Sequence, residues 1–307
     1  MGCARCTRLG GGSCVPAEVV EATLERPRDL GDAIARLADD PDLQALGGGT
    51  AVVPALSARD GIGSPTERRW LAVDSLAELL APIRLDDGWL TFGAATTLRS
   101  LELEPLVLRH APLLAAATGS VAGPAIRNQA TIGGSLALGL WSPDPATAMV
   151  ALDGRIVVGR TDGIAEIRPE ERRPRDLIIG VRIPVASSDP QGVAWAYRRH
   201  TMRGAADRPI VTVAVTADVA GSAGDVRIAI GAATAAVVRL TATEAAVVQG
   251  DDAMTAAAAE LEGLAIRTDD RASAGYRRRV AAVLVGRAVA AATAARAVAA
   301  ATAGRRS

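Results

Sequence analysis

The sequence of 307 residues contains no lysine, so arginine supplies every permanently charged basic side chain. Basic and acidic residues balance at 34 each, and this formal neutrality argues against a nucleic-acid-binding surface. Aromatic residues make up only 2% of the chain, and Phe92 is the single phenylalanine. We therefore expect a core built from valine, leucine, isoleucine and alanine.

Long hydrophobic runs are also missing. No apolar run reaches the roughly 18–20 residues that cross a bilayer without charge, and Arg287 and Arg296 interrupt the alanine-rich stretch 280–304. The N-terminus has no hydrophobic run of the signal-peptide type. These absences predict a cytoplasmic protein without a membrane span.

Cysteine is confined to Cys3, Cys6 and Cys14, and the only histidines are His110 and His200. Three clustered cysteines do not make a disulfide framework. Their spacing resembles part of a metal or iron–sulfur site, which needs a fourth ligand. The alternative, which we favour, is an extended tail with free thiols or a start codon placed too far upstream.

The hydrophobic pattern divides the chain into a glycine- and cysteine-rich disordered tail at 1–17, a first domain at 18–187, a second at 192–298 and a tail at 299–307. In the first domain the pattern predicts strands at 18–23, 43–46, 69–74, 83–85, 89–93, 154–159 and 178–184, helices at 29–38, 98–108 and 111–118, a short helical segment at 76–80, and a buried helix or strand at 146–153. An Asp-Gly turn predicts that 83–85 and 89–93 form a hairpin.

In the second domain strands precede helices. The pattern predicts strands at 192–199 and 225–231, a strand or buried helix at 209–217, and helices from 241, at 252–262 and at 272–303. This order is typical of an α+β domain. Residues 185–192 have the composition of a linker.

Two glycine-rich turns stand out in the first domain. Gly47-Gly48-Gly49-Thr50 follows a strand, and Thr131-Ile132-Gly133-Gly134-Ser135 follows a polar segment. Glycine lets backbone N–H groups come close to an anion because no Cβ stands in the way. Either turn alone is a weak signal, but together they predict a site for one phosphate-bearing cofactor.

These motifs resemble the FAD-binding medium subunit of the molybdenum hydroxylases, the family of carbon monoxide dehydrogenase and xanthine dehydrogenase. Residues 47–54 are similar to its first FAD pyrophosphate loop, and 126–136 to its second. Residues 176–184 resemble the strand that closes the FAD domain, 197–211 the start of the C-terminal domain, and 268–279 the start of the last helix. The resemblance covers about residues 18–298.

The resemblance implies a fold class, a cofactor and partners. We expect an α+β protein, with a two-subdomain FAD-binding domain of the vanillyl-alcohol-oxidase-like (PCMH) type followed by a smaller C-terminal α+β domain. In this family, electrons from a molybdopterin-containing large subunit pass through the [2Fe-2S] clusters of a small subunit to FAD and then to an acceptor. We therefore expect FAD as the cofactor and a heterotrimer, or a dimer of heterotrimers, as the assembly.

The expected cofactor-binding residues are Gly47, Gly48, Gly49, Thr50, Ala51, Val52, Val121, Asn128, Thr131, Ile132, Gly133, Gly134, Ser135, Asp144, Ile178 and Arg199, with no catalytic or metal residue in this chain. For Asp144 the alternative is a solvated turn aspartate, and for Arg199 a solvated strand charge, which we slightly favour. Arg127 and Asn128 either lock the loop or contact the ligand. Trp141 either covers the flavin or plugs the turn.

Several positions depart from the family pattern. Ala51 stands where many members have aspartate or serine, Leu138-Gly139-Leu140 replaces His-Ala-Asp, and the loop before the closing strand shortens to 163–168. They leave open two other functions: an assembly scaffold that has lost FAD, or a stand-alone flavin oxidoreductase.

Overall fold

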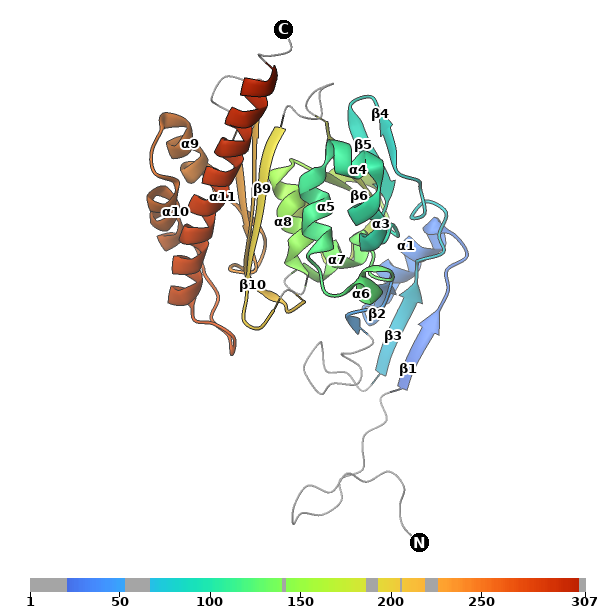
Figure 1. Ribbon diagram of the computed structural model, residues 1–307. Coiled ribbons are helices and arrows are strands. Elements are labelled where there is room, and N and C mark those ends of the chain that lie inside the picture. Colours follow the sequence, from blue (N-terminus) through green and yellow to red (C-terminus); the bar gives the residue numbers. More distant parts are fainter. Residues whose placement is uncertain are drawn as a thin grey trace, which may run out of the picture.

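The computed structural model describes residues 21–52, 67–139, 142–185, 193–204, 206–218 and 226–303. These residues form three β-sheets with helices between and outside them (Figure 1). None of the helices in these ranges combines the length and hydropathy that a membrane crossing needs. The three cysteines, the predicted tail 1–17 and Trp141 lie outside the described residues.

The first sheet is parallel. Its order is β1 (Glu21–Glu25), β3 (Glu67–Ala72), β2 (Leu43–Leu46), so the chain crosses over through α1 (Leu30–Asp39) between β1 and β2. The helix begins where predicted, because the Asp29 side chain accepts a hydrogen bond from the backbone N–H of Asp32 at 2.8 Å. β2 ends directly at the first glycine-rich turn.

The second sheet is antiparallel, in the order β4-β5-β8-β6-β7. Its strands are β4 (Arg84–Asp86), β5 (Trp89–Gly93), β6 (Arg155–Arg160), β7 (Gly163–Ile167) and β8 (Leu177–Pro184). The predicted hairpin is confirmed: Asp87 and Gly88 have φ of 46° and 76°, as a two-residue turn between twisted strands requires.

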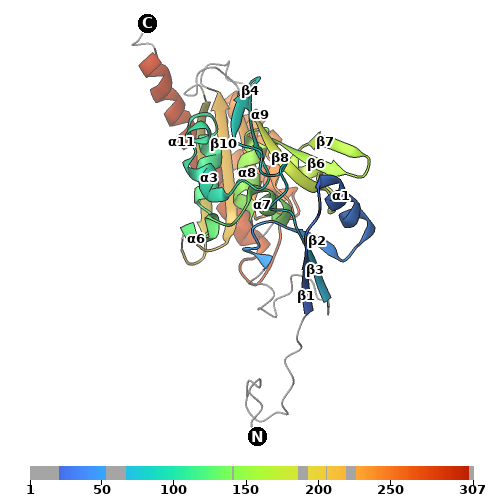
Figure 2. The same cartoon turned by 90° about the vertical axis from the view of Figure 1, so that its right-hand side faces the viewer.

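One expectation for this sheet is wrong. Residues 163–168 are not a shortened loop, because Gly163–Ile167 pairs in register with β6. Gly163, with φ of 130°, starts the strand in a conformation that other residues rarely adopt. In Figure 2 the resulting β6–β7 hairpin lies near α1, and α1 contacts β6.

Six short helices follow β5 and precede β6: α3 (Leu98–Leu103), α4 (Pro105–His110), α5 (Pro112–Gly119), α6 (Pro124–Arg127), α7 (Ile132–Leu138) and α8 (Pro143–Ala151). The predicted single helix across 98–108 is wrong, since Glu104 is extended and Pro105 begins a new helix. The predicted helical segment at 76–80 is a series of turns. Residues 146–153 belong largely to a helix, α8, which starts at Pro143.

The third sheet is antiparallel, in the order β12-β11-β10-β9. It contains β9 (Val193–Thr201), β10 (Pro209–Asp218), β11 (Val226–Gly231) and β12 (Val238–Arg239), so 209–217 is a strand. Three helices follow: α9 (Thr241–Gln249), α10 (Ala253–Glu262) and α11 (Ala274–Ala303). Figure 1 shows α11 on one face of this sheet and α8 on the other, and both contact β10.

Candidate functional site

The two glycine-rich turns lie directly against each other. A Cβ added to Gly48 would fall 1.8 Å from the carbonyl oxygen of Gln129, and one added to Gly47 would fall 2.8 Å from Thr131 Oγ1. Real Cβ atoms do not approach other atoms so closely, so only glycine allows this contact. The structure therefore joins the two motifs that the sequence separates by about eighty residues.

Hydrogen bonds to other parts of the protein hold the backbone of the second turn in place. The amides of Ile132 and Gly133 donate to the carbonyls of Thr96 and Ala94, both at 2.9 Å, and the amide of Gly134 donates to Thr131 Oγ1 at 3.1 Å. The first amides of α7 therefore have acceptors inside the protein. Our expectation that this turn offers free amides to a phosphate is wrong for these three residues.

The first turn differs in its backbone donors. In the described part of the chain, the backbone N–H groups of Gly48 and Gly49 have no acceptor, and both residues are half-buried. Gly49 has φ of 68°, the left-handed conformation that glycine adopts at little cost. Half-buried amides without a partner, held beside a second turn, fit an anionic group of a ligand.

A cavity of about 470 Å³ opens beside these turns. It lies between the parallel sheet, α7 and the start of β8, and its volume is in the range of cofactor sites. Most of the predicted residues line it, namely Gly47, Gly48, Gly49, Thr50, Ala51, Val52, Thr131, Gly133, Gly134, Ser135 and Ile178.

The other predicted residues lie outside this lining: Val121, Asn128, Ile132, Asp144 and Arg199. Ile132 is fully buried in the hydrophobic core, and Asn128 is exposed at the end of α6. Val121 lends its carbonyl oxygen to Arg127 at 3.0 Å. The structure therefore gathers the two turns and Ile178 around one cavity and places these five residues elsewhere.

Asp144 and Arg199 form a buried ion pair at the junction of α8 and β9. Asp144 is 2% exposed, its Oδ1 accepts a hydrogen bond from Tyr197 Oη at 2.7 Å, and Arg199 Nε lies 3.0 Å from the same oxygen. Burial raises the pKa of Asp144 despite the charge of Arg199, and burial beside Asp144 raises the pKa of Tyr197 well above its ordinary value. The solvated alternatives for Asp144 and Arg199 are both wrong.

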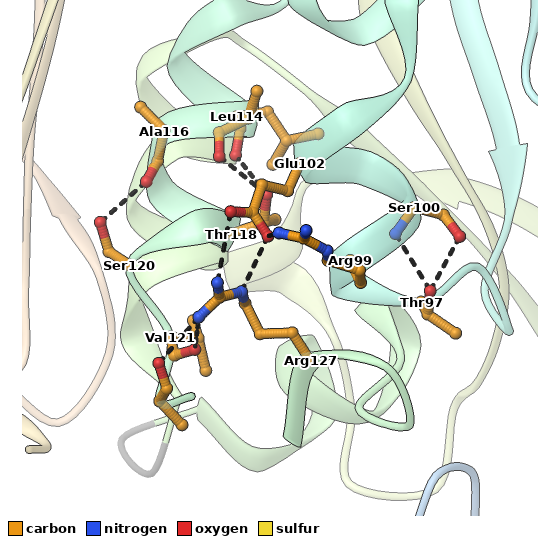
Figure 3. Close-up of polar contacts among 12 residues, drawn as sticks. Thr97, Arg99, Ser100, Glu102, Leu114, Ala116, Thr118, Ser120, Val121 and Arg127 are labelled. Atoms are coloured by element: carbon orange, nitrogen blue, oxygen red, sulfur yellow. Dashed lines mark hydrogen bonds and ion pairs between the residues drawn. The ribbon is translucent and has the colours of Figure 1, made fainter. Parts of the chain in front are cut away.

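Arg127 is a structural residue in this arrangement. Its side chain is 8% exposed, its Nε donates to Glu102 Oε2 at 2.9 Å, and its Nη1 donates to the carbonyls of Val121 and Ala122 at 3.0 and 2.8 Å (Figure 3). Ala122 has φ of 43°, so the guanidinium holds a strained turn. Of our two alternatives for Arg127, the structure favours loop locking.

Sequence reasoning missed several residues of the cavity wall. Trp70 on β3 is 8% exposed, and its Nε1 has no hydrogen-bond partner. Arg172, Arg175 and Asp176 precede β8, and Asp176 is held by Arg160 at 2.7 and 2.6 Å. The dense run of charges at 170–176, next to the closing strand, was the available signal.

No metal site accompanies the cavity in the described ranges, where histidine, cysteine and acidic side chains form no group of three that could hold an ion.

Comparison with known families identifies the cofactor of this chain. The family model for the FAD binding domain in molybdopterin dehydrogenase matches residues 20–186, and that for the CO dehydrogenase flavoprotein C-terminal domain matches residues 195–292. The chain belongs to the FAD-binding subunits of the molybdenum hydroxylase family. FAD is thus the cofactor, as expected, and the predicted fold class is confirmed.

Individual relatives agree with this family. The xanthine dehydrogenase FAD-binding subunit of Escherichia coli O157:H7 is 37% identical over 143 residues, 47% of this chain and 48% of that protein. The chain thus spans about half the length of the Escherichia coli relatives that it matches. The nicotine 6-hydroxylase medium subunit of Paenarthrobacter nicotinovorans is 29% identical over 280 residues. The match covers 85% of this chain and 93% of that protein.

A solved structure is also similar. Carbon monoxide dehydrogenase from Hydrogenophaga pseudoflava, in a form that lacks the Mo-pyranopterin moiety of the molybdenum cofactor, contains a chain with a TM-score of 0.78 and 26% identity. The match covers 89% of this chain and 97% of that chain. It includes both the FAD-binding region and the C-terminal region of this molybdenum hydroxylase flavoprotein.

Proposed function

We propose that this chain is the electron-transfer flavoprotein of a cytoplasmic molybdenum hydroxylase, assembled with a molybdopterin-containing large subunit and a [2Fe-2S] small subunit. The observation that carries the proposal is the cavity beside the two interlocked glycine turns, in a chain of this family. Similarity to medium subunits along most of the chain supports the partners. The substrate would belong to the large subunit.

The residues of this chain bind and orient the cofactor. The amides of Gly48 and Gly49, which have no acceptor among the described residues, are suited to donate to pyrophosphate oxygens, and Val52, Leu138 and Ile178 would give the bound cofactor an apolar wall. Bound FAD would supply the redox chemistry, accepting and releasing electrons. Cofactor contacts by all of the expected residues stay predictions, including those of Val121, Asn128, Ile132, Asp144 and Arg199, which lie outside the cavity lining.

The partners can be tested by purifying the tagged chain from the cells that express it naturally. We expect a complex with molybdenum, iron and a flavin band near 450 nm, and flavin that is reduced when the substrate of the large subunit is added. A chain that purifies alone with FAD and turns over by itself would show a stand-alone oxidoreductase. A colourless chain in the complex, which takes up no added FAD, would show a scaffold.

A further inference from the structure

Arg172 occupies a position between two cavities. A second cavity of about 180 Å³ lies between α7, α8 and the residues that follow β11, and both cavities include Arg172 and Ala137 in their walls. Arg172 Nη2 donates to the carbonyl oxygen of Ala137 at 3.2 Å. The half-buried guanidinium therefore caps the C-terminal end of α7 and faces the cofactor cavity.

Among the described residues, no carboxylate forms an ion pair with Arg172, and the charge of Asp176 acts on it only from a distance. The other hydrogen bonds of Arg172 go to the carbonyls of Arg173 and Pro174, at 3.1 and 3.5 Å. The nearby carboxylate of Asp176 is held at both oxygens by Arg160. Burial lowers the pKa of Arg172, and the charge of Asp176 only partly opposes this. A half-buried cation of this kind is stabilised when an anion enters the cavity.

The other arginine of the cavity wall, Arg175, is exposed, whereas Arg172 is half-buried. Arg175 Nη1 donates to the carbonyl oxygens of Leu37 and Asp40, the latter at 2.9 Å. Oxidised FAD carries its negative charge on the pyrophosphate, and the chain has no lysine to meet it. Ala137 lies one turn of α7, about 5 Å, beyond Gly134, and Arg172 lines the same cavity as both glycine turns.

We propose that Arg172 is the counter-charge of the cofactor pyrophosphate and a determinant of FAD affinity. This inference rests on the FAD-binding function proposed above. It assigns a charged contact to a residue outside both glycine motifs. The amides of the first turn would fix the pyrophosphate in place, and Arg172 would supply the positive charge that contacts it.

The test uses the full-length chain, stripped of flavin and titrated with oxidised FAD at several salt concentrations. We expect Arg172→Gln to weaken FAD binding roughly ten- to a hundredfold, as loss of a charged hydrogen bond does, and to flatten its salt dependence. Arg172→Lys keeps the charge and should retain most of the affinity. The matched control is Arg173→Gln, the same change at an exposed neighbour outside both cavity walls, with little expected effect.

Riboflavin, which has no pyrophosphate, should bind the Arg172→Gln variant as it binds the unaltered chain. Unchanged FAD affinity and salt dependence in Arg172→Gln would overturn the proposal. A lower flavin midpoint potential with unchanged FAD affinity would overturn it as well. Equal losses in Arg172→Gln and Arg173→Gln would also overturn it, because they would indicate a general charge effect. Failure of the unaltered chain to bind FAD would instead refute the proposed function. Thermal unfolding of each variant shows whether it is folded.

Discussion

Tyr197 donates its phenolic hydrogen to Asp144 Oδ1 across 2.7 Å, and this bond ties β9 to the first turn of α8. Tyr197 lies in the region matched by the C-terminal family model, and Asp144 in the region matched by the FAD-binding model. Arg199 Nε adds its charge to the same oxygen at 3.0 Å. A buried polar network of this kind fixes how two parts of a protein dock, because leaving any member unpaired is costly.

Replacing Tyr197 with phenylalanine should therefore destabilise the protein. We expect the free energy of unfolding to fall by about 1–3 kcal/mol, the cost of leaving a buried acceptor without its donor, measured by urea denaturation. Tyr276→Phe is the control, because Tyr276 Oη pairs with His200 Nε2 at 2.8 Å on an exposed surface. Its effect should stay below about 0.5 kcal/mol. Equal losses would contradict a special role for the Tyr197–Asp144 bond.

The same variant should change the pH dependence of stability. Burial raises the pKa of Asp144, and the Tyr197 hydrogen bond opposes that rise. A raised folded-state pKa gives stability that is present below the unfolded pKa and lost as pH rises through the folded pKa. Without Tyr197 this pKa should rise further, so Tyr197→Phe should lose more stability near pH 8 than near pH 4. Parallel unfolding curves across pH would argue against this.

Gly48→Ala tests whether the two turns must touch. Its Cβ would fall 1.8 Å from the carbonyl oxygen of Gln129, so the turns would have to separate. We expect FAD affinity to drop at least roughly tenfold, because a loss of about 1.4 kcal/mol in binding free energy is enough for that change. Gly123→Ala is the matched control, since a Cβ there meets no atom within 4 Å. Flavin fluorescence titration measures both, and equal affinity in the two variants would refute the contact's importance.

Glu102 should make the helical region sensitive to acid. Burial alone would raise the pKa of Glu102, but hydrogen bonds from Arg99 and Arg127 outweigh it and hold the pKa below its ordinary value. A lowered pKa gives stability that is present above the unfolded pKa and lost as pH falls through the folded pKa. Glu102→Gln should therefore remove part of the acid-induced loss.

At neutral pH, Glu102→Gln should cost about 2–3 kcal/mol, since it leaves the guanidinium of Arg127 without a charged partner. Glu166→Gln is the control, because the Glu166–Arg182 pair is about a third exposed, and exposed pairs contribute only about 0–1 kcal/mol. Thermal unfolding across pH measures both variants. A similar acid sensitivity in Glu102→Gln and the unaltered chain would rule out Glu102 as its source.

Local patterns predicted the fold where a local cause acts. The Asp29 cap and the Asp87-Gly88 turn depend only on neighbouring residues, and both elements form where expected. The expected helix across 98–108 is interrupted before Pro105, although the leucine periodicity continues through this proline. The sequence did not predict β7, because the glycine at its start, Gly163, is typical of a loop. The structure pairs this segment with β6 as a hairpin.

The site divides in the same way. The glycines at 47–49 and 133–134 indicate that the backbone comes close to another group. They do not indicate that Gly48 contacts the carbonyl of Gln129. Arg172 and Trp70 belong to no motif, and only the folded chain brings them to one cavity. The alternating pattern of its strand does not reveal that Arg199 is buried in an ion pair with Asp144 of α8. Such residues depend on tertiary contacts between distant segments.

The burial of α8 has a consequence for how this protein unfolds. All residues of Pro143–Ala151 are buried, and Thr147 Oγ1 lies 2.8 Å from Thr212 Oγ1 of β10. The main hydrophobic core accordingly includes Ala214 and Ala229 from the third sheet. The two regions matched by separate family models thus share buried contacts on one face of the third sheet, while a second hydrophobic core lies between that sheet and the C-terminal helices. A chain cut between the two matched regions would expose α8 to water, and the intact protein should melt as a single cooperative unit.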